Sequence, residues 1–226
     1  YTKLALAASK STSQFLYETN VGAGLPVLST LNDLLHSGDK IEKIEAVLSG
    51  TLSYIFNSYD GLIPFSEVVK KAKAKGYTEP DPRDDLNGID VARKLLILAR
   101  ETGHMLELKD VDTENLVPEK ARSSKSVEDF FTKLKKEDTY FESIRDKAAK
   151  NNEKLCYIAT LEKKKTYIRL ESIGQNHPFY SLSGSDNIVS FTTNRYKNTP
   201  LVIKGPGAGA EVTAAGVFAD ILRISN

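Results

Sequence analysis

The spacing of apolar residues along the chain predicts alternating helices and strands. Between Leu28 and Leu35 the leucines recur every three or four positions, as on one face of a helix, and Gly38 stands where such a helix would stop. In residues 43–48, apolar and polar residues alternate, which is typical of a half-buried strand. The two periodicities therefore already indicate a layered fold of helices on a sheet.

The same patterns predict further elements, some with their boundaries. The predicted helices span residues 3–11, 51–59 (a helix or a turn), 67–75 with Ser66 as cap and Gly76 as stop, 82–100 with Gly103 as stop, 127–136 with Ser126 and Asp129 as a capping box, 139–151 and 212–224. The predicted strands span residues 15–18, two runs within 154–173 joined by a lysine-rich turn, 188–194 and 200–205. This order predicts an α/β or α+β layered fold with a mixed sheet covered by helices.

Composition narrows the class of protein. The 226 residues are 40% hydrophobic with a formal net charge of +1, so no field of one sign attracts nucleic acid or a membrane surface. No apolar run approaches the roughly 18 residues that suggest a membrane span. Cys156 is the single cysteine, which excludes a disulfide framework and favours a reducing, cytoplasmic location. The first residues read as the middle of a helix, so we expect the chain to begin inside a longer protein.

A glycine-rich turn separates the last predicted strand from the last predicted helix. Its glycines, Gly205, Gly207 and Gly209, follow the spacing G-x-G-x-G rather than the G-x-G-x-x-G of a dinucleotide-binding turn. Amides at the start of the following helix could hold a phosphate. Close packing of helix on strand explains the same glycines, and the spacing leaves both interpretations open.

The segment "NVGAGLP" forms a second glycine turn, directly after Glu18. A carboxylate beside exposed carbonyl groups could bind a hard cation through oxygen ligands. A tight strand-to-helix turn without any ion explains the same residues, so the spacing alone does not decide between them.

The richest chemistry lies in residues 76–94, "GYTEPDPRDDLNGIDVARK". Asp81, Pro82 and Asp84 are typical of a helix start, with Asp81 as the N-cap. Asp90 and Lys94 are four residues apart and share a helix face that is otherwise apolar, so they form a narrow polar stripe that lines either a cleft or a subunit contact. Helix capping and an active-site cluster both remain possible for this stretch.

Residues 72–94 fit the pattern A-x(3)-G-Y-T-x(2)-D-P-x(2)-D-L-x-G-x-D-x(3)-K, which resembles the signature of the homoserine dehydrogenases. The segments "LSGTLSYIFN" and "DVARKLLILARETG" are also similar to that family. The forms "YETNVGAGLP" and "AAGVFADIL" look most like the dehydrogenase half of the bifunctional aspartokinase–homoserine dehydrogenases. The resemblance extends over nearly the whole chain.

The resemblance implies oxidoreduction between L-aspartate 4-semialdehyde and L-homoserine with NADP or NAD, on the route to threonine and methionine. It also implies three parts of the chain: a remnant of a Rossmann-type nucleotide domain in 1–18, a substrate-binding, catalytic and dimerisation domain in 19–198, and a return to the nucleotide domain in 199–226. The expected partners are the small-molecule substrate and further copies of the chain, in a homodimer or higher homo-oligomer.

The resemblance also implies site residues, position by position. Lys94 and Asp90 would be catalytic, and the substrate would be bound by Glu79 and Asp85, with Tyr77, Gly50 and Thr51 lining the pocket. The cofactor would lie against Gly207, Gly209 and Thr213. A monovalent cation, expected to be sodium, would be held by Glu18 and the carbonyls of Val21, Ala23 and Leu25. The residue types suit the chemistry, because an ammonium such as that of Lys94 can stabilise and protonate the oxygen of an aldehyde that accepts a hydride.

The chain departs from the family pattern because the N-terminal G-x-G-x-x-[GA] turn and a second, lysine-bearing catalytic segment are not in it. We therefore expect the chain to be inactive alone. Two alternatives stay open. One is a dimerisation and binding module whose acids are only caps and ion pairs. The other is an NAD(P)-dependent dehydrogenase of related architecture that acts on another amino-alcohol.

Overall fold

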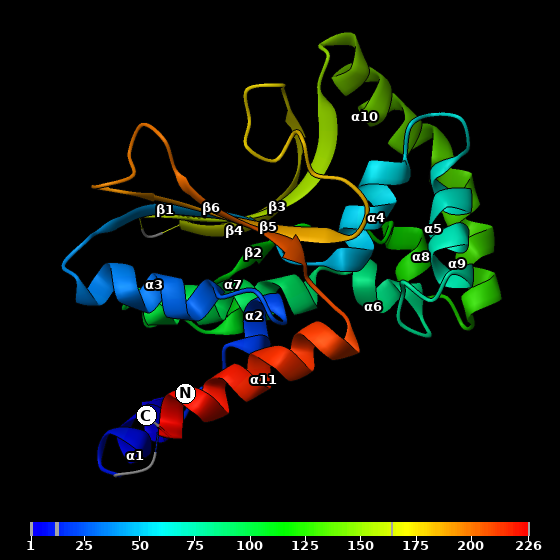
Figure 1. Ribbon diagram of the computed structural model, residues 1–226. Helices are drawn as coiled ribbons and strands as arrows, with labels where there is room; N and C mark the ends of the chain where they lie inside the picture. Colours follow the sequence, from blue (N-terminus) through cyan, green and yellow to red (C-terminus); the bar gives the residue numbers. More distant parts are fainter. Residues whose placement is uncertain (1, 12–13, 164, 226) are drawn as a thin grey trace.

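The computed structural model describes residues 2–11, 14–163 and 165–225, and it arranges them around a six-stranded sheet (Figure 1). The strands, in the order β2-β4-β3-β1-β5-β6, are β1 Ile41–Val47, β2 Asp112–Thr113, β3 Lys154–Glu162, β4 Lys165–Ile173, β5 Asp186–Thr193 and β6 Leu201–Pro206. Neighbours are antiparallel except for the parallel pair β2 and β4, so the predicted mixed sheet is confirmed.

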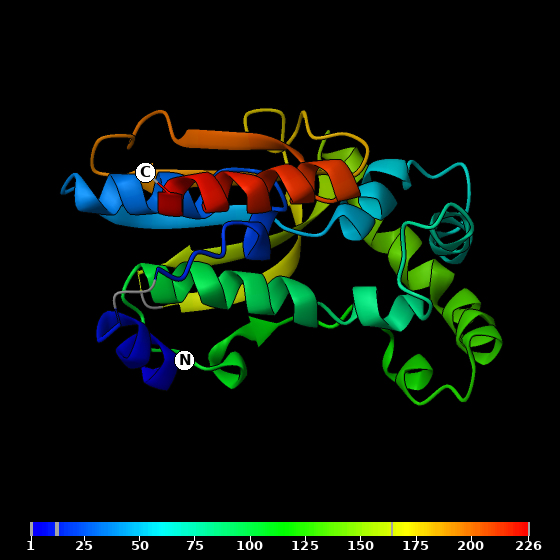
Figure 2. The same ribbon diagram turned by 60° about the horizontal axis from the view of Figure 1, so that its bottom comes forward.

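Helices cover mainly one face of this sheet. They are α1 Thr2–Ser9, α2 Thr19–Gly22, α3 Val27–His36, α4 Gly50–Ser58, α5 Phe65–Ala74, α6 Pro82–Leu86, α7 Ile89–Glu101, α8 Glu119–Arg122, α9 Val127–Leu134, α10 Asp138–Lys150 and α11 Ala210–Ser225, with 3-10 turns at Leu108–Asp110 and Lys135–Glu137. Helices α3 and α7 lie side by side under the sheet, α4, α5, α9 and α10 gather at one end, and α11 runs along the outer side of the α3–α7 layer (Figures 1 and 2). None of the described helices combines the length and apolarity needed to cross a membrane.

The main core lies between the sheet and these helices. Phe65 and Phe141 stack with ring centroids 3.8 Å apart, and both are almost completely buried, as is Phe130. Burial of each such ring contributes about 1.5–3 kcal/mol. A smaller cluster on the opposite face includes Cys156, and burial raises the pKa of its thiol to about 12. Cys156 is therefore a core residue of this second cluster.

Many predicted boundaries are confirmed because they depend on local geometry. Gly38, Gly76 and Gly103 each follow a helix with a positive φ of +82°, +73° and +86°, a conformation that glycine adopts without strain. The Ser126 hydroxyl caps α9 by accepting the Asp129 amide at 3.1 Å. The reciprocal half of the predicted capping box is absent from the described contacts, because the Asp129 carboxylate accepts from the Lys125 amide instead.

The strand predicted at residues 15–18 is wrong. This segment is irregular and leads into α2, and no described strand pairs with it. Phe15 is 66% exposed, so its apolar ring does not enter the sheet core. A short apolar run specifies burial only when another element covers it, and here no described strand does so.

The single helix predicted for residues 82–100 is two helices, α6 and α7. Gly88 separates them with a φ of +74°, which a continuous helix does not allow. The Tyr157 hydroxyl lies so close to Gly88 that a Cβ there would come within 2.2 Å of it. The turn at Gly88 therefore packs against β3, and a side chain at this position does not fit beside Tyr157.

The predicted cap of α5 is also wrong. Ser66 lies inside the helix, and the cap position is Pro64, which offers no side-chain hydrogen bond. The Asp138 carboxylate instead accepts from the Ser66 amide at 2.7 Å and from the Ser66 hydroxyl at 2.6 Å. Helix α5 is thus capped by a residue that lies 72 positions away along the chain.

Candidate active site

The acid-rich stretch begins with the predicted helix cap. The Asp81 carboxylate accepts the Arg83 amide at 3.0 Å at the start of α6, and Pro82 occupies the first helical position. The Arg83 side chain also binds the same carboxylate and reaches the Ser124 carbonyl at 2.7 Å. The hydrogen bond and ion pair with Arg83 hold the pKa of Asp81 below its usual range. Asp81 is therefore committed to the fold.

Asp85 and Glu79 lie together next to the start of α4. The Asp85 carboxylate accepts the Glu79 amide at 2.9 Å, and the Thr51 side chain lies beside this carboxylate. The Thr51 hydroxyl is within 2.5 Å of the Tyr77 carbonyl. Burial raises the pKa of Asp85, and the nearby Glu79 carboxylate raises it further. The four predicted substrate residues Thr51, Tyr77, Glu79 and Asp85 thus form one connected group.

Asp90 and Lys94 form the ion pair that their spacing predicts. The Lys94 ammonium lies 2.9 Å from the Asp90 carboxylate and donates to the Leu48 carbonyl, also at 2.9 Å. The Lys94 side chain is 20% exposed and that of Asp90 62%. Ile89 and Arg93 beside them are also exposed, whereas the apolar side of α7 is buried. The narrow polar stripe expected on this helix is therefore present, and its ammonium has one fixed backbone partner.

The turn from β1 into α4 connects these two groups. Leu48 holds the Lys94 ammonium, and Thr51, three residues later, contacts Asp85. Ser49 caps α4 by accepting the Leu52 amide at 3.2 Å. A side chain at Gly50 would begin 3.1 Å from the Ser185 carbonyl, so the loop before β5 approaches this turn closely. A cation and the acids Glu79 and Asp85 are thus positioned around one short segment.

The glycine turn at Gly205, Gly207 and Gly209 lies between β6 and α11. Helix α11 begins directly after Gly209, whose φ of +127° strongly favours glycine. The side chain of Asn187 on β5 packs against Gly207, where an added Cβ would lie 1.9 Å from it. Asn187 is fully buried, and its side-chain amide has no hydrogen-bond partner among the described residues. Close packing therefore explains Gly207, and the first amides of α11 are the groups at this turn that could hold a phosphate.

Glu18 is placed differently from the expected cation site. Its carboxylate oxygens accept the Leu28 amide at 2.6 Å and the Ser29 amide at 2.8 Å, at the start of α3. The Arg223 guanidinium of α11 lies 3.3 Å from the same carboxylate. A cation at this carboxylate would meet an existing positive charge, so these contacts do not fit it.

The carbonyls expected to complete the cation site also have other neighbours. The Leu25 carbonyl accepts the Val27 amide at 2.8 Å. The Ala23 carbonyl faces Gly216 of α11, where an added Cβ would lie 3.1 Å from it. The backbone here packs on α11.

Sequence reasoning missed two functional contacts. One is the Leu48 carbonyl that fixes Lys94, because a backbone group gives no signal in the sequence. The other is the contact of Glu18 with Arg223 and of the Glu18 amide with Asp220, which ties α11 to the start of α3. Arg223 and Asp220, one turn apart on the last helix, were a detectable signal for a polar contact on that face.

Known proteins resemble this chain both in sequence and in structure. A sequence model described as homoserine dehydrogenase matches residues 26–222. The maize protein "Bifunctional aspartokinase/homoserine dehydrogenase 1, chloroplastic" is 52% identical over 228 residues, which cover 100% of this chain and 25% of that protein. The homoserine dehydrogenase of Schizosaccharomyces pombe is 46% identical over 232 residues, which cover 99% of this chain and 62% of that protein. The chain thus spans between a quarter and two thirds of the length of these relatives.

Solved structures give the same fold. A Candida auris protein described as being of unknown function superposes with a TM-score of 0.91 at 45% identity, over 97% of this chain and 64% of that one. A hyperthermophilic archaeal homoserine dehydrogenase in complex with NADPH superposes with a TM-score of 0.74 over 100% of this chain and 60% of that one. Its identity is 24%, so this second likeness shows the fold alone.

Proposed function

The chain belongs to the homoserine dehydrogenase family, and from this premise we propose that it carries the substrate half of an enzyme that interconverts L-aspartate 4-semialdehyde and L-homoserine. Lys94 and the group around Asp85 supply the two kinds of charge that this reaction needs. The observation that carries the proposal is the Lys94 ammonium, which is held by Asp90 and by the Leu48 carbonyl beside the acid group.

We assign the substrate's α-ammonium to Glu79 and Asp85. Burial and the neighbouring Glu79 carboxylate raise the pKa of Asp85, so ionised Asp85 lacks a compensating cation. An ammonium bound between the two carboxylates would supply it and would favour the ionised form. Tyr77, Thr51 and Gly50 surround this position, and the small Gly50 leaves room beside the Ser185 carbonyl.

Lys94 acts on the reacting oxygen in this proposal. A bound nicotinamide supplies the hydride that reaches the aldehyde carbon. The carbonyl oxygen then becomes an alkoxide, which the Lys94 ammonium stabilises and protonates from Nζ. Asp90, whose carboxylate lies 2.9 Å from that nitrogen, orients it before the transfer. In the reverse direction Lys94 receives the proton of the homoserine hydroxyl.

The cofactor would be held in part by the start of α11. At Gly209 nothing lies closer than 3.5 Å to an added Cβ, and Thr213 donates its amide to the Gly209 carbonyl at 3.0 Å in the first helical turn. The archaeal homoserine dehydrogenase of the same fold binds NADPH, which supports a nicotinamide cofactor for this chain. NADP, NAD and sodium remain predictions, as do the homodimer, the cytoplasmic location and the inactivity of the chain alone.

The proposal is tested by comparing two Asp–Lys pairs of the same spacing. In the full-length protein, Lys94→Ala and Asp90→Asn should lower NADPH-dependent reduction of aspartate semialdehyde by orders of magnitude with an unchanged melting temperature. Asp129 and Lys133 on α9 form a matched control, since their charges are also 2.9 Å apart. Substitutions in this control pair should leave turnover near the wild-type rate.

Equal small effects in both pairs would favour a binding module whose charged residues only stabilise helices.

The other alternative, a dehydrogenase for a different amino-alcohol, is addressed by the substrate range. Under our proposal, homoserine is oxidised with the highest kcat/KM among small amino-alcohols, and Asp85→Asn lowers kcat/KM for those that carry an α-ammonium.

A further inference from the structure

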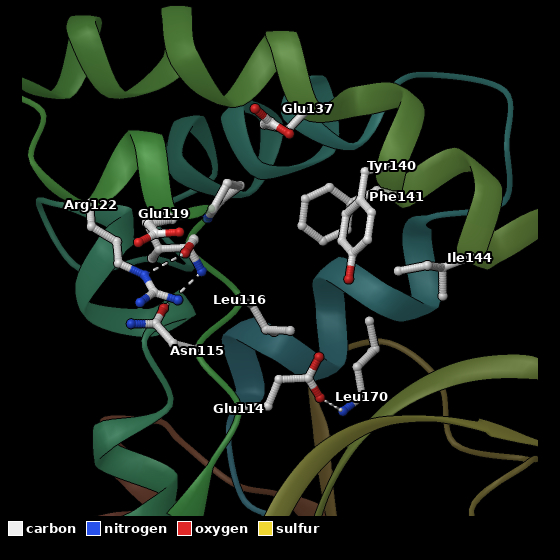
Figure 3. Close-up of a pocket in the computed structure, with 12 residues that line it drawn as sticks. Glu114, Asn115, Leu116, Glu119, Arg122, Glu137, Tyr140, Phe141, Ile144 and Leu170 are labelled. Carbon is white, nitrogen blue, oxygen red and sulfur yellow. Dashed lines mark hydrogen bonds between the residues drawn. The ribbon is translucent and has the colours of Figure 1, made fainter.

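A separate pocket lies between α8, α10 and the loop before α8 (Figure 3). Its volume is about 280 Å³, and its walls include Glu114, Leu116, Arg122, Tyr140 and Phe141. Ligand sites for drug-sized molecules usually measure about 300–1,000 Å³. This pocket therefore fits a smaller metabolite, and none of the predicted substrate, cofactor or catalytic residues lines it.

Two charged side chains in the pocket retain unused hydrogen-bonding groups. Arg122 donates from Nε to the Val117 carbonyl at 3.0 Å, and its terminal nitrogens have no hydrogen-bond or ion-pair partner among the described residues. One carboxylate oxygen of Glu114 accepts the Leu170 amide at 2.8 Å, whereas the other has no hydrogen-bond partner among the described residues. Both side chains are fixed by backbone bonds, yet each still offers charge to a ligand.

The rest of the pocket is apolar. Leu116 and Phe141 are 4% and 2% exposed and form its floor, while the ring of Tyr140 stands beside them at 55% exposure (Figure 3). Ile144 and Leu170 complete this side. Arg122 and the Tyr140–Ile144 side stand on opposite sides of Leu116, so a ligand can direct a charged end and an apolar arm to different walls.

The charges of the pocket select the class of ligand. Its lining holds three carboxylates, those of Glu114, Glu119 and Glu137, and the single guanidinium of Arg122. A simple anion would be repelled by the carboxylates, and a simple cation would leave the guanidinium unpaired. A small zwitterion satisfies both, with its carboxylate on Arg122 and its ammonium on Glu114.

We propose that this pocket binds a free α-amino acid with a medium-sized aliphatic side chain. The side chain would pack on Leu116, Phe141 and Ile144. A residue that lines the pocket also contacts the region of the proposed active site. The Leu116 amide donates a hydrogen bond to the Leu86 carbonyl, at the end of α6, at 2.9 Å. In addition, the Glu114 carbonyl accepts from the Tyr157 hydroxyl, which touches the Gly88 break before Asp90.

The test is calorimetric titration of the full-length protein with L-leucine and two truncated analogues. The first analogue, 4-methylpentanoate, lacks the ammonium, and the second, 3-methylbutylamine, lacks the carboxylate. L-leucine should bind about tenfold or more tightly than either, because each loses a charge-assisted hydrogen bond. Arg122→Gln and Glu114→Gln should each weaken L-leucine binding by a similar factor, and Glu114→Gln keeps an acceptor for the Leu170 amide.

Two controls separate this site from the proposed substrate site. Lys147→Ala removes an exposed cation from helix α10 outside the pocket lining and should leave the affinity unchanged. Asp85→Asn should also leave L-leucine binding intact, whatever it does to homoserine. The proposal is overturned if L-leucine gives no saturable heat, if it binds no better than its analogues, or if Asp85→Asn abolishes binding while Arg122→Gln and Glu114→Gln do not. None of these outcomes depends on turnover, so they are independent of the proposed reaction.

Discussion

Gly88→Ala probes the contact that divides α6 from α7 and places Asp90 and Lys94. Two physical costs act at this position. The φ of +74° is unfavourable for alanine, and the new methyl group would lie 2.2 Å from the Tyr157 hydroxyl and 2.9 Å from a Thr113 methyl carbon. Gly76 isolates the first cost, because it has a φ of +73° with nothing within 4 Å of an added Cβ.

The magnitudes follow from these distances. A left-handed conformation costs a non-glycine residue about 1–2 kcal/mol, which is the loss expected for Gly76→Ala. At Gly88, overpacking adds about 1–3 kcal/mol. Displacing the Tyr157 hydroxyl from the Glu114 carbonyl adds about 0.5–1.5 kcal/mol. Gly88→Ala should therefore lower stability by about 2.5–6.5 kcal/mol in total, well beyond the control.

Both variants are compared by denaturant unfolding, first in the wild-type background and then with Tyr157→Phe. Removing the hydroxyl relieves the closest overlap, so the extra cost of Gly88→Ala over Gly76→Ala should fall by about 1 kcal/mol or more. NADPH-dependent activity of the folded Gly88→Ala protein should also decrease, because the first turn of α7 carries Asp90. Equal costs at the two glycines, or an extra cost at Gly88 that Tyr157→Phe leaves unchanged, would refute the steric argument.

Two further predictions concern stability. Burial raises the pKa of Asp85 above its usual 3.8, so the stability from its protonated form is present below 3.8 and is lost as the pH rises through the folded pKa. Asp85→Asn does not titrate, so the melting temperature of this variant should rise relative to that of the wild type as the pH rises. A melting-temperature difference between the two proteins that does not change with pH would contradict this prediction. Ser49→Ala removes the α4 cap and should cost about 0.5–2 kcal/mol, measured as a lower melting temperature, whereas Ser49→Thr should retain most of the stability.

The sequence motif predicted some features of the proposed active site and not others. The spacing of Asp90 and Lys94 predicted their ion pair, because residues four apart meet on any helix. The family resemblance supplied the roles of Glu79 and Asp85, and the structure brings these two residues together next to Thr51. The cation site at Glu18 stays a prediction, and the structure adds a contact that the motif does not contain, because the guanidinium of Arg223, more than two hundred positions away, lies 3.3 Å from this carboxylate.

The sequence alone determined those features that depend on near neighbours along the chain. The helix stops at Gly38 and Gly76 and the caps at Asp81 and Ser126 each need only a few adjacent residues, and so does the Asp90–Lys94 pair.

Only the tertiary structure decided where distant segments meet. Tyr157 packs against Gly88, Asp138 caps α5, and Leu48 fixes the Lys94 ammonium, although each pair is separated by dozens of residues. Periodicity reports which face of an element is apolar, but it does not report which residue of another element will lie against that face. The partners that give the proposed active site its geometry are therefore set by packing.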